Sequence, residues 1–128
     1  MSFCEEIKKE VINKAISLIK SSKKIIEMTM NMEEELVNPL PQKYHGLLKK
    51  LVKKNIKISR YTYGDKKLVS KIKDLYPQIN IIYSGNLNKY QRMLIIDRNY
   101  GLFSINGKVF FTNFKPLIKS LLEYAKIK

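Results

Sequence analysis

Tyr90 and Arg92 stand two positions apart, just before residues 93–96, the most apolar strand-like run of this chain. A tyrosine can attack a phosphate, although its phenol, with a pKa of about 10, is a weak nucleophile at neutral pH. Arg92 would share the face of Tyr90 and could lower that pKa, and a guanidinium can hold a phosphate through two hydrogen bonds. The alternative for Tyr90 is a packed side chain or one that stacks on a base.

The surrounding residues are similar to the motif of the phospholipase D superfamily, in which His-x-Lys and an Asp are separated by four residues, and a strand that ends with Gly-Ser and Asn follows. Tyr90 stands in the place of the histidine, Arg92 stands in the place of the lysine, and Asp97 falls in register. Ser104 and Asn106 lie near the last positions. The resemblance implies an α/β fold with a residual phosphate site. Because the catalytic histidine is absent, it also argues against the family's chemistry.

His45, the one histidine of the chain, does not replace the missing nucleophile. Enzymes of the superfamily use two histidines, supplied by two motif copies in one chain or by a dimer. His45 lies at the start of a different predicted helix, where we expect a surface or half-buried position. The sequence also has no metal-ligand cluster and no glycine-rich phosphate loop, and we therefore predict no metal and no cofactor.

Periodicity predicts an α/β domain around these residues. Apolar residues at three- and four-residue spacing predict helices over 3–21, 44–54, 66–76 and 114–125. Alternating or continuous apolar runs predict strands over 24–30, 56–63, 79–83, 93–96, 100–105 and 108–111, with a type I′ turn at Asn106-Gly107. This order predicts a mixed, mainly parallel sheet flanked by helices, with a C-terminal hairpin and helix.

Three local features complete the prediction. Residues 31–42 are expected to be irregular, because Pro39, Pro41 and an acidic run oppose both sheet and long helix. The run 79–83 is continuous enough to be buried on both faces, as parallel strands are. Asn55 is predicted to end the second helix in a left-handed conformation, and Asn113 to cap the last one.

The order of elements extends the resemblance to about residues 5–112. The segment Lys53-Lys54-Asn55-Ile56-Lys57-Ile58 is similar to the one that leads into a strand of the phospholipase D fold. The closing helix and the altered motif also resemble the effector domain of archaeal TrmB-type transcription regulators, which is not catalytic. Those regulators carry a winged helix ahead of the domain, and we expect none here, because residues 3–21 are too short to form one.

Charge is distributed unevenly over the 128 residues, whose formal net charge is +14. Residues 1–35 carry six lysines and seven acids, whereas residues 36–128 carry nineteen lysines and arginines and only four acids. Such a field attracts polyanions over a Debye length of about 8–10 Å. A coding bias is the alternative, because Lys, Ile, Asn and Tyr are all abundant. Tyrosines in this region can stack on bases or pack in a core: Tyr44, Tyr61, Tyr63, Tyr90 and Tyr100.

Length and composition exclude several other classes of protein. A chain of 128 residues, 45% of them hydrophobic, suits one globular domain over residues 1–128. No apolar run approaches the roughly 18 residues of a membrane span, and acids near the N-terminus are wrong for a secretory signal. The single Cys4 cannot form an internal disulfide. We therefore expect a cytoplasmic protein without a membrane partner.

These observations favour a non-catalytic phospholipase D-like domain that binds DNA or RNA through a basic surface of residues 43–128. The predicted contacts are Lys53, Lys54, Arg60, Lys89, Tyr90, Arg92 and Asn106. Because the superfamily pairs two motifs across an interface, the resemblance implies a homodimer with Tyr90 and Arg92 near its two-fold axis. Two alternatives stay open. One is an effector-sensing or protein-interaction domain, which binds a small molecule or a separate DNA-binding chain. The other is a residual nuclease or phosphotransferase.

Overall fold

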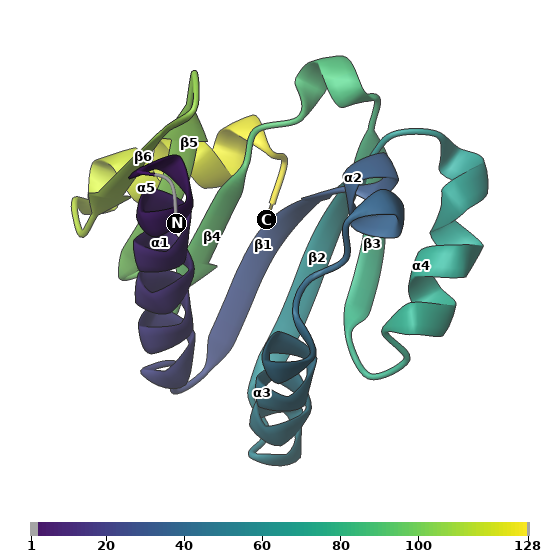
Figure 1. Cartoon of the computed structure of the whole chain (residues 1–128), viewed down its shortest axis with the longest axis horizontal. Coiled ribbons are helices and arrows are strands. Elements are labelled where there is room, and N and C mark those ends of the chain that lie inside the picture. The colour runs from purple at the N-terminus through teal and green to yellow at the C-terminus, as the bar shows by residue number, and fades with distance from the viewer. Residues whose placement is uncertain (1–2, 128) are drawn as a thin grey trace.

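A computed structural model describes residues 3–127, with the side chains of residues 10–127. Six strands form one sheet in the order β3-β2-β1-β4-β5-β6, and helices cover it (Figure 1). The strands are β1 (Ile25–Asn31), β2 (Lys57–Tyr63), β3 (Asn80–Gly85), β4 (Met93–Ile96), β5 (Tyr100–Ile105) and β6 (Lys108–Thr112). The helices are α1 (Phe3–Lys20), α2 (Met32–Val37), α3 (Gln42–Lys53), α4 (Val69–Leu75) and α5 (Lys115–Tyr124), with 3-10 turns at η1 (Lys66–Leu68) and η2 (Leu87–Lys89).

The sheet is mixed, as predicted. Strands β1, β2 and β3 are parallel to one another, whereas β4 is antiparallel to β1, and β5 and β6 continue the antiparallel half. Parallel neighbours need long crossovers, which α2 with α3 and then α4 provide. The parallel part is therefore half of the sheet and not most of it, because the chain returns through η2 to place β4 beside β1 (Figure 1).

The core lies on both sides of the sheet because strand side chains alternate between its faces. Ile26 and Met28 pack towards α1 and α3, and Met30, on the same face of β1, packs towards α2 and α4. Met93 and Phe103 lie on the other face and pack against α5. Among residues 3–127, no helix has the length and hydropathy that a membrane span requires.

Residues 32–37 were predicted to be irregular, and this prediction is wrong, because they form α2. Asn31 caps the helix, since its side-chain oxygen accepts a hydrogen bond from the Glu34 amide at 3.1 Å. The acidic run lies in the first turn, where the helix dipole favours negative charge. Pro39 and Pro41 follow the helix and do not prevent it.

Strand β3 and the start of α5 also differ from the prediction. β3 is an edge strand, and Ile82 on its outer face is 40% exposed, so the strand is not buried on both faces. The last helix begins at Lys115 without an Asn113 cap, and the amide of Phe114 instead donates to Thr112 Oγ1 at 3.0 Å. The left-handed conformation of Asn55, with φ of 67°, is as predicted.

Candidate phosphate site and basic surface

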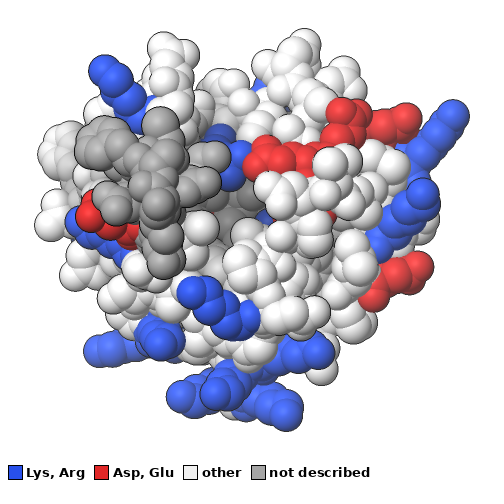
Figure 2. Space-filling model, viewed as in Figure 1, with Lys and Arg blue, Asp and Glu red and all other residues white. Residues whose placement is uncertain are grey.

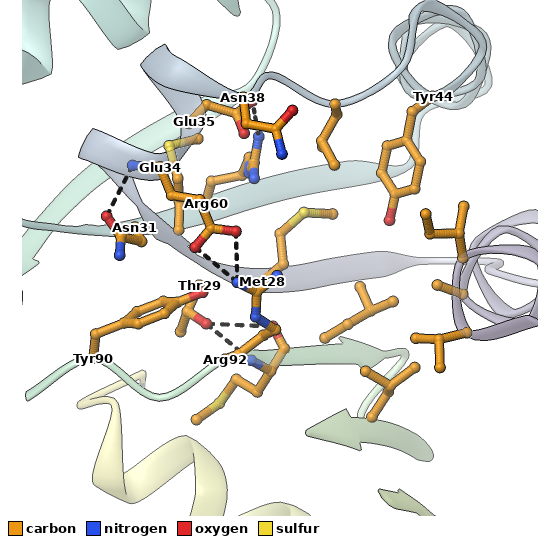
Figure 3. A pocket seen from close by; sticks show the side chains of 18 residues that line it. Met28, Thr29, Asn31, Glu34, Glu35, Asn38, Tyr44, Arg60, Tyr90 and Arg92 are labelled. Carbon is orange, nitrogen blue, oxygen red and sulfur yellow. Dashed lines mark hydrogen bonds and ion pairs between the residues drawn. The ribbon is translucent and has the colours of Figure 1, made fainter. Parts of the chain in front are cut away.

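Tyr90 and Arg92 line a cavity of about 190 Å³ beneath α2, at the carboxyl end of β1 (Figure 3). One end of the cavity is polar, with side chains from β1, β2 and α2. The other end is apolar and is formed by α1, Leu40 and Leu102. The segment before β4 is fixed there because Thr29 Oγ1 donates to the carbonyl oxygen of Gln91 at 2.6 Å and accepts from the Met93 amide at 3.0 Å.

Arg92 is already occupied by a carboxylate. Its Nη2 lies 2.7 and 2.8 Å from the two oxygens of Glu34 on α2 (Figure 3). Burial alone would lower the pKa of Arg92, but the hydrogen bond to Glu34 and the charges of Tyr90 and Glu34 together outweigh it and raise the pKa above its ordinary value. Because both side chains are about half exposed, the pair contributes only about 0–1 kcal/mol. A phosphate at Arg92 would have to displace Glu34 or coexist with it.

Tyr90 is poorly suited to act as a nucleophile. Burial raises its pKa above the ordinary value of 10, and the neighbouring Arg92 only partly offsets that effect. Arg92 lowers this pKa, as we predicted, but burial raises it by more. The ring of Tyr90 also packs at 5.8 Å from that of Tyr63, at a tilt of 56°. Tyr90 therefore stays a neutral phenol near pH 7, where it can donate a hydrogen bond and pack.

Arg60 does not belong to the exposed basic surface on which we placed it. It is 5% exposed, and its Nη1 lies 3.4 Å from Oε1 of Glu35, which is also buried. Burial lowers the pKa of Arg60, and the charge of Glu35 acts against that shift. Its Nε is the one buried side-chain nitrogen or oxygen of the described residues that lacks a hydrogen-bond partner. Arg60 thus belongs to the interior and to the wall of the cavity.

His45 lies outside this cavity. Its ring stacks on Tyr76 with centroids 4.9 Å apart, and its Nε2 is 3.4 Å from the Tyr76 hydroxyl, which also hydrogen-bonds Glu35. Tyr76 also separates the histidine from Arg60, whose guanidinium carbon lies 5.1 Å from the centroid of the Tyr76 ring. His45 does not line the space beside Tyr90. Within residues 10–127, histidine, cysteine and acidic side chains form no group of three that could hold a metal ion.

The remaining predicted contacts are not gathered at Arg92. Asn106 is exposed at the tip of the β5–β6 hairpin, with φ of 51°, and Lys89 lines a separate hollow beside Tyr63 and Tyr124. Lys53 and Lys54 lie at the end of α3, near the starts of the parallel strands. The seven residues of β1 separate that edge from Arg92 by about 20 Å at ~3.3 Å per residue.

Exposed lysines instead gather at this opposite edge. We call the following residues the lysine rim: Lys20, Lys23, Lys24, Lys49, Lys50, Lys53, Lys54 and Lys57. The strands bring the parts of the rim together, because the Lys57 amide donates to the Lys24 carbonyl oxygen at 3.0 Å. Figure 2 shows lysine and arginine side chains along the lower border of the molecule, below α3, whereas acidic side chains gather near α2.

Asp97 lies at the rim, where backbone amides bind its carboxylate and no salt bridge joins it to a described lysine. Its carboxylate oxygens accept hydrogen bonds from the amides of Lys23, Lys24 and Ile25 at 2.8–2.9 Å. Partial burial would raise the pKa of Asp97, but these backbone hydrogen bonds outweigh it and lower the pKa below its ordinary value. Asp97 is therefore a structural residue that fastens the α1–β1 connection to the β4–β5 turn, and it takes no part in the cavity at Arg92.

Comparisons with known proteins reveal the fold alone. No protein-family model matches the sequence, and a search of curated proteins finds no match. Among solved structures, NucT from Helicobacter pylori is similar, with a TM-score of 0.61 and 17% sequence identity over 92% of this chain and 86% of that chain. The α/β architecture, with its C-terminal hairpin and helix, therefore resembles the phospholipase D-like fold of NucT.

Sequence reasoning missed the residues that control Arg92 and Arg60. Glu34 and Glu35 were treated as part of an irregular acidic run, although Asn31 followed by acids is a helix-start pattern. That pattern would have revealed α2. It would not have revealed the pairing, because Glu34 and Arg92 are 58 residues apart in sequence.

Proposed function

We propose that this chain is a nucleic-acid-binding domain that does not cleave its ligand. The observation that carries the proposal is that the exposed lysines, unlike three arginines, form no salt bridges among the described residues. The salt bridges among the described residues all use arginine, whereas the rim lysines are exposed and have no acidic partner. The unpaired charge is available to a polyanion, whose phosphates release counterions when lysines replace them.

The lack of catalysis in this proposal rests on the geometry around Tyr90. A phosphodiester-cleaving site needs an activated nucleophile and an acid for the leaving group. Tyr90 has a raised pKa, Arg92 is engaged by Glu34, and His45 does not line the cavity. The similarity to the fold of NucT supports a role connected with nucleic acid. We further propose the homodimer and, as another partner, a separate DNA-binding chain.

Binding and cleavage can be tested with the same labelled DNA and RNA oligonucleotides. In fluorescence anisotropy, the affinity should fall steeply with salt, with a slope of about −0.7 per neutralised phosphate of a single strand. Gel analysis should detect no cleavage with or without divalent metal. Absence of binding at low salt, or an affinity that does not depend on salt, would refute the binding function. Cleavage that is lost in Tyr90→Phe would refute the non-catalytic part.

An effector-binding function is the second candidate, and the cavity favours it. Arg60 Nε has no partner, and the hydroxyl of Tyr44, which lines the same space, points into it (Figure 3). Burial raises the pKa of Tyr44 to about 12, so this hydroxyl is a hydrogen-bond donor at any ordinary pH. A small molecule with an acceptor oxygen would satisfy these donors. Under this function, oligonucleotides would not bind.

A further inference from the structure

A groove beside the lysine rim has the features of a base-binding surface. It is a hollow of about 380 Å³ between α1 and the β5–β6 pair, and Lys14, Leu18, Tyr100 and Phe111 contribute to its lining. Tyr100 is 48% exposed and Phe111 is 38% exposed. The ammonium of Lys14 lies 4.1 Å from the centroid of the Phe111 ring. The groove therefore combines two accessible aromatic rings with a cation that lies close to one of them, Phe111.

The groove and the rim are continuous. Tyr100 pairs with Ile96 across the β4–β5 turn, and Asp97 in that turn binds the amides of Lys23 and Lys24. From Lys24 the rim passes to Lys57 through the backbone hydrogen bond between β1 and β2. Exposed cations thus extend from the side of the groove near Tyr100, along the starts of β1 and β2, to the end of α3.

We propose that the lysine rim and the Tyr100–Phe111 groove together bind single-stranded nucleic acid, at the edge of the sheet opposite Tyr90 and Arg92. This inference rests on the proposed function and names its surface and the class of its ligand. The lysines contact phosphates, and one or two unpaired bases enter the groove and stack on Tyr100 or Phe111. A duplex keeps its bases stacked on one another and offers none to the groove. The proposed ligand is therefore a single-stranded nucleic acid.

The chain offers a matched pair of variants for the test. Changing Lys49, Lys50, Lys53 and Lys54 to glutamine removes four exposed charges from the rim. Changing Lys67, Lys71, Lys115 and Lys119 to glutamine removes the same number of exposed charges from η1, α4 and α5. A third variant, Tyr100→Ala with Phe111→Ala, removes the rings and leaves every charge in place. Circular dichroism and thermal melting establish that each variant is folded.

Fluorescence anisotropy then compares labelled thymidine and uridine oligonucleotides of about 12 nucleotides with a DNA duplex of equal length. At about 50 mM salt, the rim variant should bind single strands at least ten-fold more weakly, with a salt slope smaller by up to about 3, while the control variant changes little. The affinity of the aromatic variant for single strands should fall about five-fold or more, and the salt dependence of its binding should stay unchanged. The wild-type protein should prefer a single strand to the duplex. Comparing its affinities for the thymidine and uridine oligonucleotides shows whether it prefers DNA or RNA.

The outcomes separate this inference from the proposed function. If the wild-type protein binds no oligonucleotide, the proposed function fails. If it binds, but the control variant loses as much affinity as the rim variant, the location is wrong. Equal affinity for duplex, or an aromatic variant that binds normally, overturns the base-stacking groove. An aromatic variant with a changed mass in solution and unchanged affinity would also overturn it, because the groove would then be an interface between copies.

Discussion

At the scale of single residues, two motif positions retain charged side chains, and these side chains bind other groups of the same chain. Asp97 accepts three backbone amides and the hydroxyl of Ser22, and Arg92 holds Glu34. The position of Asp97 after an apolar strand was visible in the sequence as a turn. Its partners were not, because Lys23 and Lys24 are more than 70 residues away in the chain.

Asp97→Asn tests the structural role of this carboxylate. The pKa of Asp97 is lower in the folded chain than its ordinary 3.8, so the stabilisation is present above that value and is lost as the pH falls through the folded pKa. We expect a loss of about 1–2 kcal/mol in the free energy of unfolding at pH 7. Urea denaturation should give a difference between the proteins that shrinks below about pH 4. A difference that is constant from neutral to acid pH would contradict this role.

The buried pair of Arg60 and Glu35 predicts a non-additive effect. Arg60→Met leaves the carboxylate of Glu35 in the interior without its cation, and we expect this to destabilise the fold by about 3 kcal/mol or more. The double variant Arg60→Met with Glu35→Leu removes both charges and should recover most of that loss. Chemical denaturation of the two single variants and the double variant measures the coupling. Losses that simply add would show that the two side chains act independently.

At the scale of elements, local sequence signals were sufficient for most of the sheet. Alternation and turn residues predicted the β5–β6 hairpin, whose Asn106 and Gly107 both have positive φ. The edge position of β3 was not predictable, because an apolar run that packs under one helix resembles a run that is covered on both sides. The antiparallel insertion of β4 beside β1 was missed because strand order depends on contacts that are distant in sequence.

Helix α2 positions both acids of the cavity, and its cap offers a direct test. Asn31→Ala removes the side-chain acceptor for the Glu34 amide and should cost about 1 kcal/mol. Val37, at the other end of the same helix, is 86% exposed, and Val37→Ala should stay within about 0.5 kcal/mol of the wild-type protein. Thermal or urea unfolding compares the two. Equal losses for both would mean that Asn31 does not hold the start of the helix.

At the scale of the whole molecule, the lysine rim and the Tyr90–Arg92 pair lie at opposite ends of strand β1. The end with Arg92 is balanced by Glu34 and Glu35, whereas no rim lysine forms a salt bridge with an acid among residues 10–127. The excess of cations in residues 36–128 was visible in the sequence. Its location was not, because the rim also takes lysines from the end of α1 and the start of β1.

Amide chemical-shift mapping by NMR during titration with an unlabelled thymidine oligonucleotide tests this central claim most directly. We expect the perturbed amides to cluster at residues 20–25, 49–57, 100–101 and 111–113, and to weaken together as salt is added. Residues 31–35 and 90–92 should stay unperturbed. Perturbations centred on residues 31–35 and 90–92, without perturbation of the lysine rim, would contradict the account. They would show that the oligonucleotide binds beside Tyr90 and Arg92.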